Sequence, residues 1–241
     1  MIVISFGLSL NLQDGAYCLY RPYFYLTARK GFMESYRTIK QEISAEFVER
    51  RSKFIGHIKP VQTEDDAITF IQKIKTKHWD ATHNVYAYSL KTGQTRRYSD
   101  DGEPQGTAGI PTLDVLLKAE VTDAVVVVTR YFGGIMLGAG GLVRAYSQAA
   151  SLAIEASGIL QMQQCHLIQI SCNYNQYGKV SSLILEYNGQ IDDTSFGEHV
   201  SVQFHMSYEN FNRFEKQLAD VTCGTVTSVV IGKDFFAVST L

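Results

Sequence analysis

The sequence lacks the features of a secreted protein, of a protein with a structural metal site and of a membrane-spanning protein. Its four cysteines form no Cys-x-x-Cys pair and have no nearby histidine at zinc-finger spacing, so neither a disulfide framework nor a structural metal is indicated. The apolar stretch at residues 2–10 has no basic segment before it, and Gln13–Asp14 interrupt the apolar run well short of a membrane span. We therefore expect a cytoplasmic protein without a secretion signal or a transmembrane helix.

A surplus of positive charge is also missing. The formal net charge is -2 at pH 7, and residues 33–160 carry 15 basic and 15 acidic side chains. Residues 161–241 carry four basic and eight acidic side chains, which excludes a broadly basic, phosphate-coating surface for the C-terminal part. Any contact with nucleic acid must then be local to the N-terminal part.

Motifs for nucleophilic catalysis and for nucleotide cofactors are absent as well. Ser99, Ser147 and Ser151 lack a Gly-x-Ser-x-Gly elbow. The glycines of residues 133–141 are not followed by the Lys and Ser or Thr of a phosphate loop, and a dinucleotide fingerprint fails at Val143. These absences favour a protein that is not an enzyme and that holds neither a cofactor nor a metal.

A chain of 241 residues that is 45% hydrophobic can bury one large core or two ordinary ones. Alternation of apolar and polar residues predicts strands at residues 43–48, 53–58, 84–90 and 95–99. The run Ala124–Thr129 is apolar on both sides, which is typical of a central strand.

Three helices are predicted between these strands and after them. The first is capped by Thr63 and has an acidic first turn and a basic last turn. Its core face is expected to carry Ile68, Ile71 and Ile74. The second begins at about Pro111, and the third covers residues 142–157 and is closed by Gly158. The many alanines of the third helix indicate close packing on a sheet.

The pattern restarts from His166 with the order strand, helix, strand, strand, helix, strand. These elements are predicted at residues 167–172, 176–187, 189–194, 199–207, 209–219 and 224–231. The order βαββαβ is that of a ferredoxin-like split βαβ unit. We therefore expect two domains, at residues 33–160 and 165–241.

The first 32 residues have neither clean periodicity nor helix caps. An organised strand pattern follows directly from Met33, so we expect the folded protein to start there and residues 1–32 to be an upstream or non-native extension. The alternative is an extra strand or an aromatic arm packed on the domain.

Two segments rich in glycine, at residues 99–111 and 129–146, are the most informative feature of the chain. Five glycines fall between Gly133 and Gly141, where only unusual dihedral angles or a close backbone approach would favour so many. A strand, a glycine-rich loop and a helix start can form an anion site, because free N–H groups and the helix dipole point to one spot. The alternative is that these glycines only let an alanine-rich helix pack on the sheet.

The predicted anion or nucleic-acid site combines these glycines with neighbouring cationic and aromatic side chains. Its residues are Arg97, Arg130, Tyr131, Gly133, Gly134, Gly140, Gly141 and Arg144. Guanidinium groups bind phosphate in a bidentate manner, so we expect these arginines on the outer surface. We also expect the segments 99–111 and 133–146 to meet in space.

The predicted site also includes a supporting acidic loop. Asp100, Asp101 and Glu103 have the oxygens that a hard cation needs, but the run is also typical of an acidic turn, which we favour. Its carboxylates would then orient neighbouring guanidinium groups. His83 is expected to be a hydrogen-bonded structural residue rather than a base, and Trp79 is expected to be a core residue rather than a stacking platform.

Three runs of this sequence resemble the YigZ/IMPACT family. They are His83–Tyr88, Ser99–Gly109 with Pro111, and Val127–Tyr146. The resemblance is strong from Met33 to Gly158, and the βαββαβ tail fits the bacterial branch of the family. Residues 1–32 match nothing in it.

The resemblance implies an α+β fold with two domains. The N-terminal α/β domain would be like the second domain of small-subunit ribosomal protein five, and the ferredoxin-like domain like the last domain of elongation factor G. Both of these proteins work on ribosomes. Eukaryotic members of the family act in translational control by competing for a ribosome-bound activator of a kinase. That role uses an accessory domain to which the resemblance does not extend, so we do not carry it over to this chain.

We therefore expect a non-enzymatic, ribosome-associated protein that regulates translation. Its N-terminal domain would bind RNA or the surface of a ribosomal protein or translation factor. No membrane is expected among its partners. One alternative is an enzyme that acts on a small phosphorylated or nucleotide-like substrate, with Asp100, Asp101 or Glu103 as base or metal ligand. Another is a protein-interaction domain whose Tyr and Phe loops form the interface.

Overall fold

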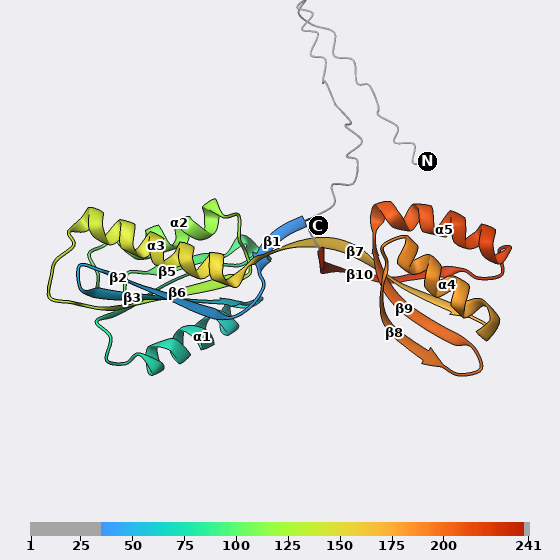
Figure 1. Cartoon of the computed structure of the whole chain (residues 1–241), viewed down its shortest axis with the longest axis horizontal. Helices are drawn as coiled ribbons and strands as arrows, with labels where there is room; N and C mark the ends of the chain where they lie inside the picture. The colour runs from blue at the N-terminus through green and yellow to red at the C-terminus, as the bar shows by residue number, and fades with distance from the viewer. Residues whose placement is uncertain (1–34, 239–241) are drawn as a thin grey trace, which may run out of the picture. The chain divides into compact units, whose positions relative to one another are not determined.

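A computed structural model of the chain describes residues 35–238. The expectations for residues 1–32 therefore lie outside the described residues. The described part is an α+β protein with two five-stranded sheets (Figure 1). All strand pairs within both sheets are antiparallel.

The N-terminal sheet has the strand order β2-β3-β6-β4-β5. Its strands are β2 (Ile43–Glu49), β3 (Ser52–Pro60), β4 (His83–Ser89), β5 (Arg96–Ser99) and β6 (Ala124–Tyr131). Its helices are α1 (Glu64–Lys77), α2 (Gly109–Lys118) and α3 (Ala139–Ser157), with a short 3-10 turn, η1 (Thr92–Gln94), between β4 and β5. Helices α2 and α3 cover one face of the sheet and α1 covers the other (Figure 1).

The central strand β6 is buried on both faces, as predicted. Val126 and Val128 belong to the core under α2 and α3, while Val125 and Val127 belong to the core under α1. An apolar residue at every position of the strand is therefore required by the two layers of helices. This arrangement holds the two ends of β6 in fixed positions on the sheet.

Helix α1 begins and ends as the sequence predicts, but its core face is rotated. The side chain of Thr63 accepts a hydrogen bond from the N–H of Asp66. The buried residues are Ala67, Phe70, Ile71 and Ile74. Ile68 is 46% exposed, so its predicted place in the core is wrong. It follows Ala67 by one residue, which turns its side chain about 100° away from the buried face.

Helix α3 packs closely on the sheet, as its alanines predict. A Cβ added to Gly56 on β3 would overlap the backbone carbonyl of Ala149 and would lie 3.1 Å from the Cβ of Ala153. The glycine that permits this close packing is therefore on the strand. The glycines before α3 serve a different purpose.

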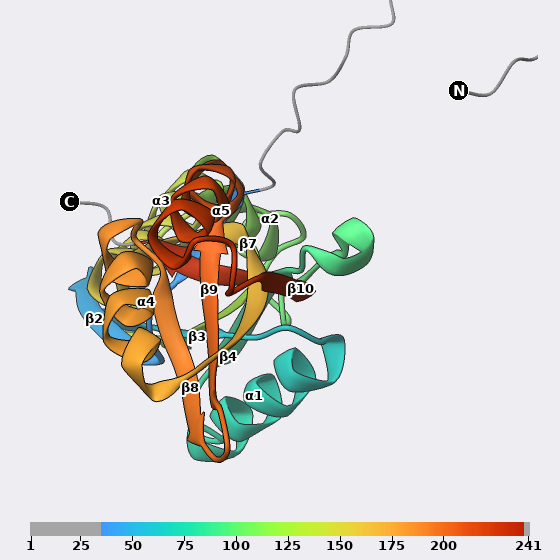
Figure 2. The same cartoon turned by 90° about the vertical axis from the view of Figure 1, so that its right-hand side faces the viewer.

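The C-terminal sheet has the strand order β10-β7-β9-β8, and β1 (Ser35–Ile39) also pairs with β7. The elements are β7 (Ile159–Cys172), α4 (Tyr174–Glu186), β8 (Gln190–Phe196), β9 (Val200–Ser207), α5 (Tyr208–Thr222) and β10 (Ser228–Val238). Both helices lie on one face of the sheet and share one core with it (Figure 2). The order βαββαβ is the one predicted from the sequence.

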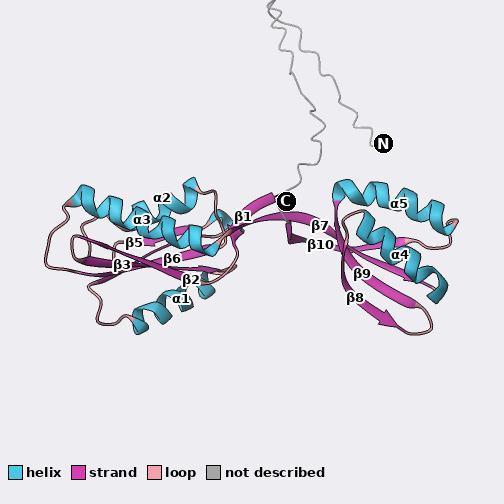
Figure 3. Ribbon diagram, in the orientation of Figure 1, coloured by secondary structure: helices cyan, strands magenta, loops and turns pink. Residues whose placement is uncertain are grey.

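Strand β7 runs without a break through the region where we expected the domain junction. Residues 159–163 pair with β1, and residues 161–166 pair with the end of β10. These three strands lie side by side in Figure 3. The junction predicted near residues 160–165 therefore falls within a paired strand. Most of its residues are only half-buried, so it carries little of the apolar signal of a core strand.

Candidate functional site

Three strand ends meet at one end of the N-terminal sheet. Strand β3 begins at Ser52, β4 begins at His83, and β6 ends at Tyr131. Lys53 pairs with Tyr131, and His83 pairs with Arg130, so the segments beyond these ends are neighbours. We call this region, residues 49–52, 78–82 and 132–144, the loop end.

The glycine-rich loop packs directly on the turn between β2 and β3. A Cβ added to Gly133 would overlap the backbone carbonyl of Arg51, and the N–H of Gly133 donates to the hydroxyl of Ser52 at 3.2 Å. Gly134 and Gly138 have φ of 81° and 72°, which a side chain would strain. Backbone approach and dihedral angles, rather than packing of α3 on the sheet, therefore account for Gly133, Gly134 and Gly138.

Arg130 is buried, so the expectation that it lies on the outer surface is wrong. It is 5% exposed, and its Nη1 lies 2.5 Å from Oε1 of Glu103. Its guanidinium group lies over the rings of Phe54 and Phe132 at 5.5 and 5.4 Å. Because side chains alternate along a strand, Arg130 points to the same face as Val128, into the core under α3. We therefore remove Arg130 from the binding surface.

Glu103 joins the two glycine-rich segments in the interior. It accepts a hydrogen bond from the hydroxyl of Tyr146 at 2.7 Å as well as one from Arg130. Burial, followed by the charge of Glu103, raises the pKa of Tyr146 far above its ordinary value, so the hydroxyl stays a donor. The expected meeting of the two segments is confirmed, but it forms a closed polar cluster.

The carboxylate of Asp100 is hydrogen-bonded to the backbone of its own loop. Its carboxylate accepts hydrogen bonds from the N–H groups of Gly106, Ala108 and Gly109 at 2.8 to 3.1 Å. Burial alone would raise the pKa of Asp100, but these three bonds hold it below its ordinary value. Asp100 therefore organises the start of α2.

Asp101 and His83 tie the same loop to β4 and α1. The carboxylate of Asp101 lies 2.6 Å from Nζ of Lys75 and accepts the N–H of Asn84 at 2.6 Å. Its carbonyl accepts a hydrogen bond from Nδ1 of His83 at 2.8 Å. Within residues 35–238, no three or more metal-ligating side chains converge. The structure gives the acidic loop and His83 the contacts of a structural turn.

Arg97 lies away from the loop end, whereas Tyr131 ends β6 directly beside it. Arg97 pairs with Tyr88 on β4, five residues beyond His83, which is about 16 Å along the strand. Its Nε lies 3.8 Å from Glu64. The hydroxyl of Tyr131 contacts Asp80 at 3.1 Å and Nδ1 of His78 at 3.0 Å, and burial followed by Asp80 raises its pKa.

Three exposed arginines do gather at the loop end. Arg50 and Arg144 line a small groove of about 130 Å³ together with Glu49. Arg51 lies beside them in the β2–β3 turn, against Gly133. Within the described residues, none of the three forms an ion pair with a carboxylate. The sequence analysis identified Arg144 and missed Arg50 and Arg51, although two adjacent arginines between the strands predicted at residues 43–48 and 53–58 are a usable signal.

Large apolar side chains are also exposed in the segments of the loop end. Trp79 is 83%, Phe132 47% and Met136 84% exposed, so the expectation that Trp79 lies in the core is wrong. Trp79 belongs to the turn after α1, beyond the buried face of that helix. The hydroxyl of Thr82 accepts the N–H of Phe132 at 3.0 Å, which holds this turn against the glycine-rich segment.

This chain, a two-domain α+β protein, matches two family models. The model described as Impact N-terminal domain matches residues 50–154. A second model, described as a domain of unknown function (DUF1949), matches residues 170–225. The two matches lie on either side of the junction region of β7.

The chain belongs to the IMPACT family. It is 38% identical over 193 residues to IMPACT family member YvyE of Bacillus subtilis, which covers 80% of this chain and 89% of that protein. It is 29% identical over 185 residues to IMPACT family member YigZ of Escherichia coli, which covers 76% and 91%. A solved structure of a hypothetical protein is 28% identical, covers 83% of this chain and 98% of its own, and has a TM-score of 0.53.

No helix within residues 35–238 is both long enough and apolar enough to cross a bilayer.

Proposed function

We propose that this chain binds RNA through the loop end, in the setting of the ribosome or a translation factor in the cytoplasm, and thereby has a role in regulating translation. The observation that carries the proposal is the exposed group of Arg50, Arg51 and Arg144, which have no carboxylate partner within residues 35–238. Membership of the IMPACT family supports the connection with translation, because that is the role the sequence resemblance implies.

The side chains at the loop end can contact both the phosphates and the bases of an RNA strand. Planar guanidinium groups bind phosphate oxygens in pairs. Exposed rings, here those of Trp79 and Phe132, stack on unpaired bases. Helix α3 starts after Gly138 without a side-chain cap, so the first N–H groups of the helix are available to a phosphate as well. RNA presents phosphates and bases together, which a small anion does not.

A protein partner is the competing interpretation of this surface, because Arg, Trp, Phe and Met are also enriched at protein interfaces. The lack of carboxylate partners for the arginines favours RNA, whose affinity is dominated by phosphate contacts. Unpaired arginines on a chain with a net charge of -2 therefore favour a polyanion. The enzyme alternative at the acidic loop loses its support, because Asp100, Asp101 and Glu103 are all bonded to groups of the protein itself.

The test is the affinity of a labelled single-stranded RNA for the full chain at several salt concentrations. The double variant Arg51→Gln/Arg144→Gln should bind at least tenfold more weakly, since two charged contacts are lost. Its slope of log affinity against log salt should be less steep by roughly 1.4, which is two phosphates at about 0.7 each. The control is Arg97→Gln, an exposed arginine away from the loop end, which should change neither quantity.

Equal affinity and equal slope for the double variant and the unchanged chain would remove these arginines from the site. A loss of affinity with an unchanged slope would also contradict the proposal, because it would show that the arginines do not contact phosphate. Thermal unfolding of each variant checks that the fold is intact.

A further inference from the structure

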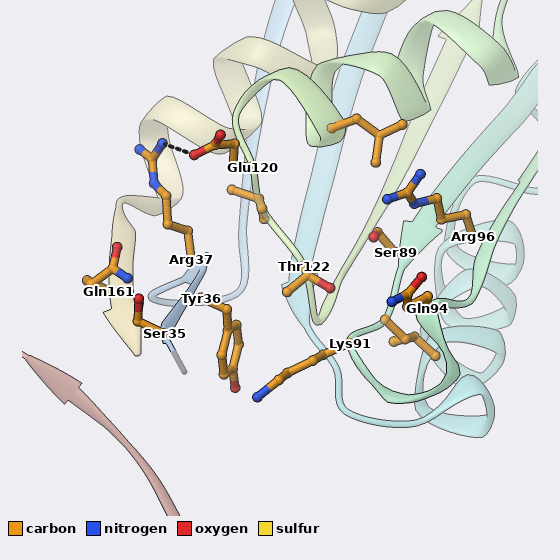
Figure 4. Close-up of a pocket in the computed structure, with 13 residues that line it drawn as sticks. Ser35, Tyr36, Arg37, Ser89, Lys91, Gln94, Arg96, Glu120, Thr122 and Gln161 are labelled. Atoms are coloured by element: carbon orange, nitrogen blue, oxygen red, sulfur yellow. Dashed lines mark ion pairs between the residues drawn. The ribbon is translucent and has the colours of Figure 1, made fainter. Parts of the chain in front are cut away.

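Two large cavities of the described chain differ in the charges around them. The first, of about 820 Å³, lies where β4 ends and is lined by side chains of both signs (Figure 4). Arg37 pairs there with Glu120 at 3.9 Å. The negative charges of Asp123 and Asp234 also lie near the lining residue Tyr36. These mixed charges select no class of ligand.

The second cavity, of about 780 Å³, lies in the C-terminal domain, where β9 ends and β8 begins. That volume is within the range of sites for small molecules, about 300 to 1,000 Å³. Within residues 35–238, its lining contains no Asp, Glu, Lys or Arg. We call it the C-terminal pocket. It shares no residue with the loop end, and neither the family resemblance nor the proposed function uses it.

His205 on β9 presents a hydrogen-bond acceptor to the C-terminal pocket. Its Nδ1 lies 2.7 Å from Oδ1 of Asp192, and because a carboxylate only accepts, this nitrogen carries a proton. In the neutral ring Nε2 is then an acceptor, and within residues 35–238 it has no hydrogen-bond partner. The buried side-chain atoms without a partner in the described chain are all on other residues, so Nε2 is open to the pocket that His205 lines. A ligand there must supply an N–H or O–H donor.

An aromatic stack holds the imidazole of His205 in place. The ring lies nearly parallel to that of Phe236 on β10, with the ring centres 3.6 Å apart and the planes at 10°. Asp192 holds Nδ1, and Phe236 covers one face of the ring. The direction of Nε2 is therefore fixed before a ligand arrives, which reduces the entropy cost of binding.

Uncharged amide groups lie around this acceptor. Asn188, Gln190 and Asn210 line the pocket, and within the described residues their side-chain amides form no hydrogen bond to the protein. Each amide offers both a donor and an acceptor, and such groups bind the edges of nitrogen heterocycles in pairs. Apolar side chains of the lining, among them Leu185 and Ile191, can pack on the faces of a flat ring.

The turn between α4 and β8 forms a fixed wall of the pocket. The N–H of Gly189 donates to the carbonyl of Ile184 at 2.8 Å. A Cβ added to Gly189 would lie 2.7 Å from Cε of Met206, so the turn packs closely on β9. Asn188 has a φ of 54°, a left-handed conformation that asparagine adopts more readily than most residues. This wall therefore does not have to form when a ligand binds.

The charged groups around the pocket do not favour an anion. Asp192 is bonded to the imidazole, and Asp234 on β10 pairs with Cys165, which places it on the same face of the sheet. Nζ of Lys233 is directed away, 5.3 Å from the centre of the Tyr208 ring. Burial, then the charge of Asp192, raises the pKa of Cys165, so its thiol stays neutral. A cation finds no carboxylate in the described lining, so an uncharged ligand is favoured.

We propose that the C-terminal pocket binds an uncharged, planar nitrogen heterocycle with an N–H donor, of the nucleobase type. The N–H donates to Nε2 of His205, the amide side chains bind the polar edge of the ring, and the apolar side chains cover its faces. The proposal does not depend on the loop end, because the two sites share no residue. Failure of either proposal therefore leaves the other standing.

The test is isothermal titration calorimetry of guanosine with the full chain. Guanosine is an uncharged heterocycle with ring N–H and amino donors, and one molecule per chain should bind. Caffeine is the matched probe, because it has the same fused ring system and methyl groups in place of the N–H donors. It should bind roughly fivefold more weakly, which is the effect of one lost hydrogen bond.

Two variants test the contacts of the protein. His205→Phe keeps a ring on Phe236 and removes Nε2, so it should weaken guanosine binding about fivefold. Asn210→Leu keeps the size of the side chain, removes the amide and should also weaken binding. The matched control is His199→Phe in the β8–β9 turn, which does not line the pocket and should bind guanosine as tightly as the unchanged chain. Equal thermal unfolding midpoints exclude loss of the fold as the cause.

A single-stranded RNA identifies the source of the heterocycle. If guanosine binds and the RNA affinity falls on His205→Phe, the pocket takes a base of an RNA strand. If guanosine binds and the RNA affinity is unchanged, the pocket takes a free nucleoside or base.

Three results would overturn the proposal. The first is no binding of guanosine by the unchanged chain. The second is equal affinity for guanosine and caffeine, which would show that Nε2 of His205 accepts no hydrogen bond from the ligand. The third is equal weakening by His205→Phe and His199→Phe, which would place the ligand elsewhere.

Discussion

The position of a single side chain in the alternation of a strand decides what an arginine does in this protein. Arg130 faces inward and is paired with Glu103, while Arg144 on the helix that follows is exposed. A buried charge is tolerated only when a partner of opposite charge and further hydrogen bonds accompany it. Glu103 meets both needs, because it binds Arg130 and Tyr146 together.

Glu103→Gln should therefore destabilise the protein strongly. The variant keeps an acceptor for Tyr146 but leaves the charge of Arg130 buried without a counter-charge, which costs about 3 to 5 kcal/mol. Urea unfolding measures this loss. The control is Glu46→Gln, which breaks the exposed pair between Glu46 and Lys53 and should cost less than about 1 kcal/mol. Equal losses for the two variants would mean that Arg130 is not buried as described.

His57 makes the stability of the fold depend on pH. It is 2% exposed, and burial followed by the charge of His78 lowers its pKa to about 4 from an ordinary 6.5. Below pH 6.5 the unfolded chain therefore binds a proton at His57 that the folded chain does not bind. The contribution of His57 to the free energy of unfolding is fully present above pH 6.5 and is lost as the pH falls toward 4. Between pH 7 and 5 the loss should be about 2 kcal/mol.

The measurement is the free energy of unfolding at both pH values for the unchanged chain and for His57→Gln. The variant lacks the titrating group, so its difference between pH 7 and 5 should be smaller by that amount. A difference of the same size in both proteins would show that His57 is not responsible.

At the scale of elements, the sequence predicted the regular parts of the fold better than the exposed parts of the site. The cap at Thr63, the central strand β6 and the end of α3 at Gly158 follow from local patterns that the packing agrees with. Trp79 was expected inside because its residue type is usually buried, but it falls in a turn beyond the apolar face of α1.

The same limit applies to the candidate site. Arg50 and Arg51 lie at the tip of the β2–β3 hairpin, and their closeness to Arg144 depends on long-range strand pairing that no local pattern contains. The inward face of Arg130 was within reach of the sequence. It follows Val126 and Val128 at a spacing of two, so the alternation of the strand already placed it in the core.

Two glycines of the loop end should respond in opposite directions to alanine. Gly133→Ala forces a Cβ into the backbone of Arg51 and should destabilise the protein by about 1 to 3 kcal/mol. Gly140→Ala adds a Cβ in open space within the first turn of α3, with its nearest atom 4.0 Å away on Arg144, and should stabilise by about 0.5 kcal/mol. Thermal unfolding distinguishes these effects, and the same sign for both would contradict the loop geometry.

At the scale of the whole molecule, the continuous strand β7 links the two regions of the chain that match the family models. Its first half pairs with β1 and the end of β10, and its second half pairs with β9.

Hydrogen exchange should show β7 as protected across the predicted domain boundary. Backbone hydrogen bonds on both edges protect the amides of residues 161–163 in the full chain. The amides of Gly134 and Met136, in the glycine-rich loop, should exchange fast and serve as the internal reference. Fast exchange at residues 161–163 would mean that the strand is not continuous there.

The most direct test of RNA binding at the loop end is photocrosslinking in a cell extract. A photoreactive amino acid replaces Met136, which is 84% exposed in the loop end, or Leu185, which is 62% exposed in the C-terminal domain. The account predicts RNA crosslinked from position 136, abolished by Arg51→Gln/Arg144→Gln, and none above background from position 185. Crosslinks from position 136 to protein alone, or RNA crosslinks of equal yield from both positions, would contradict it.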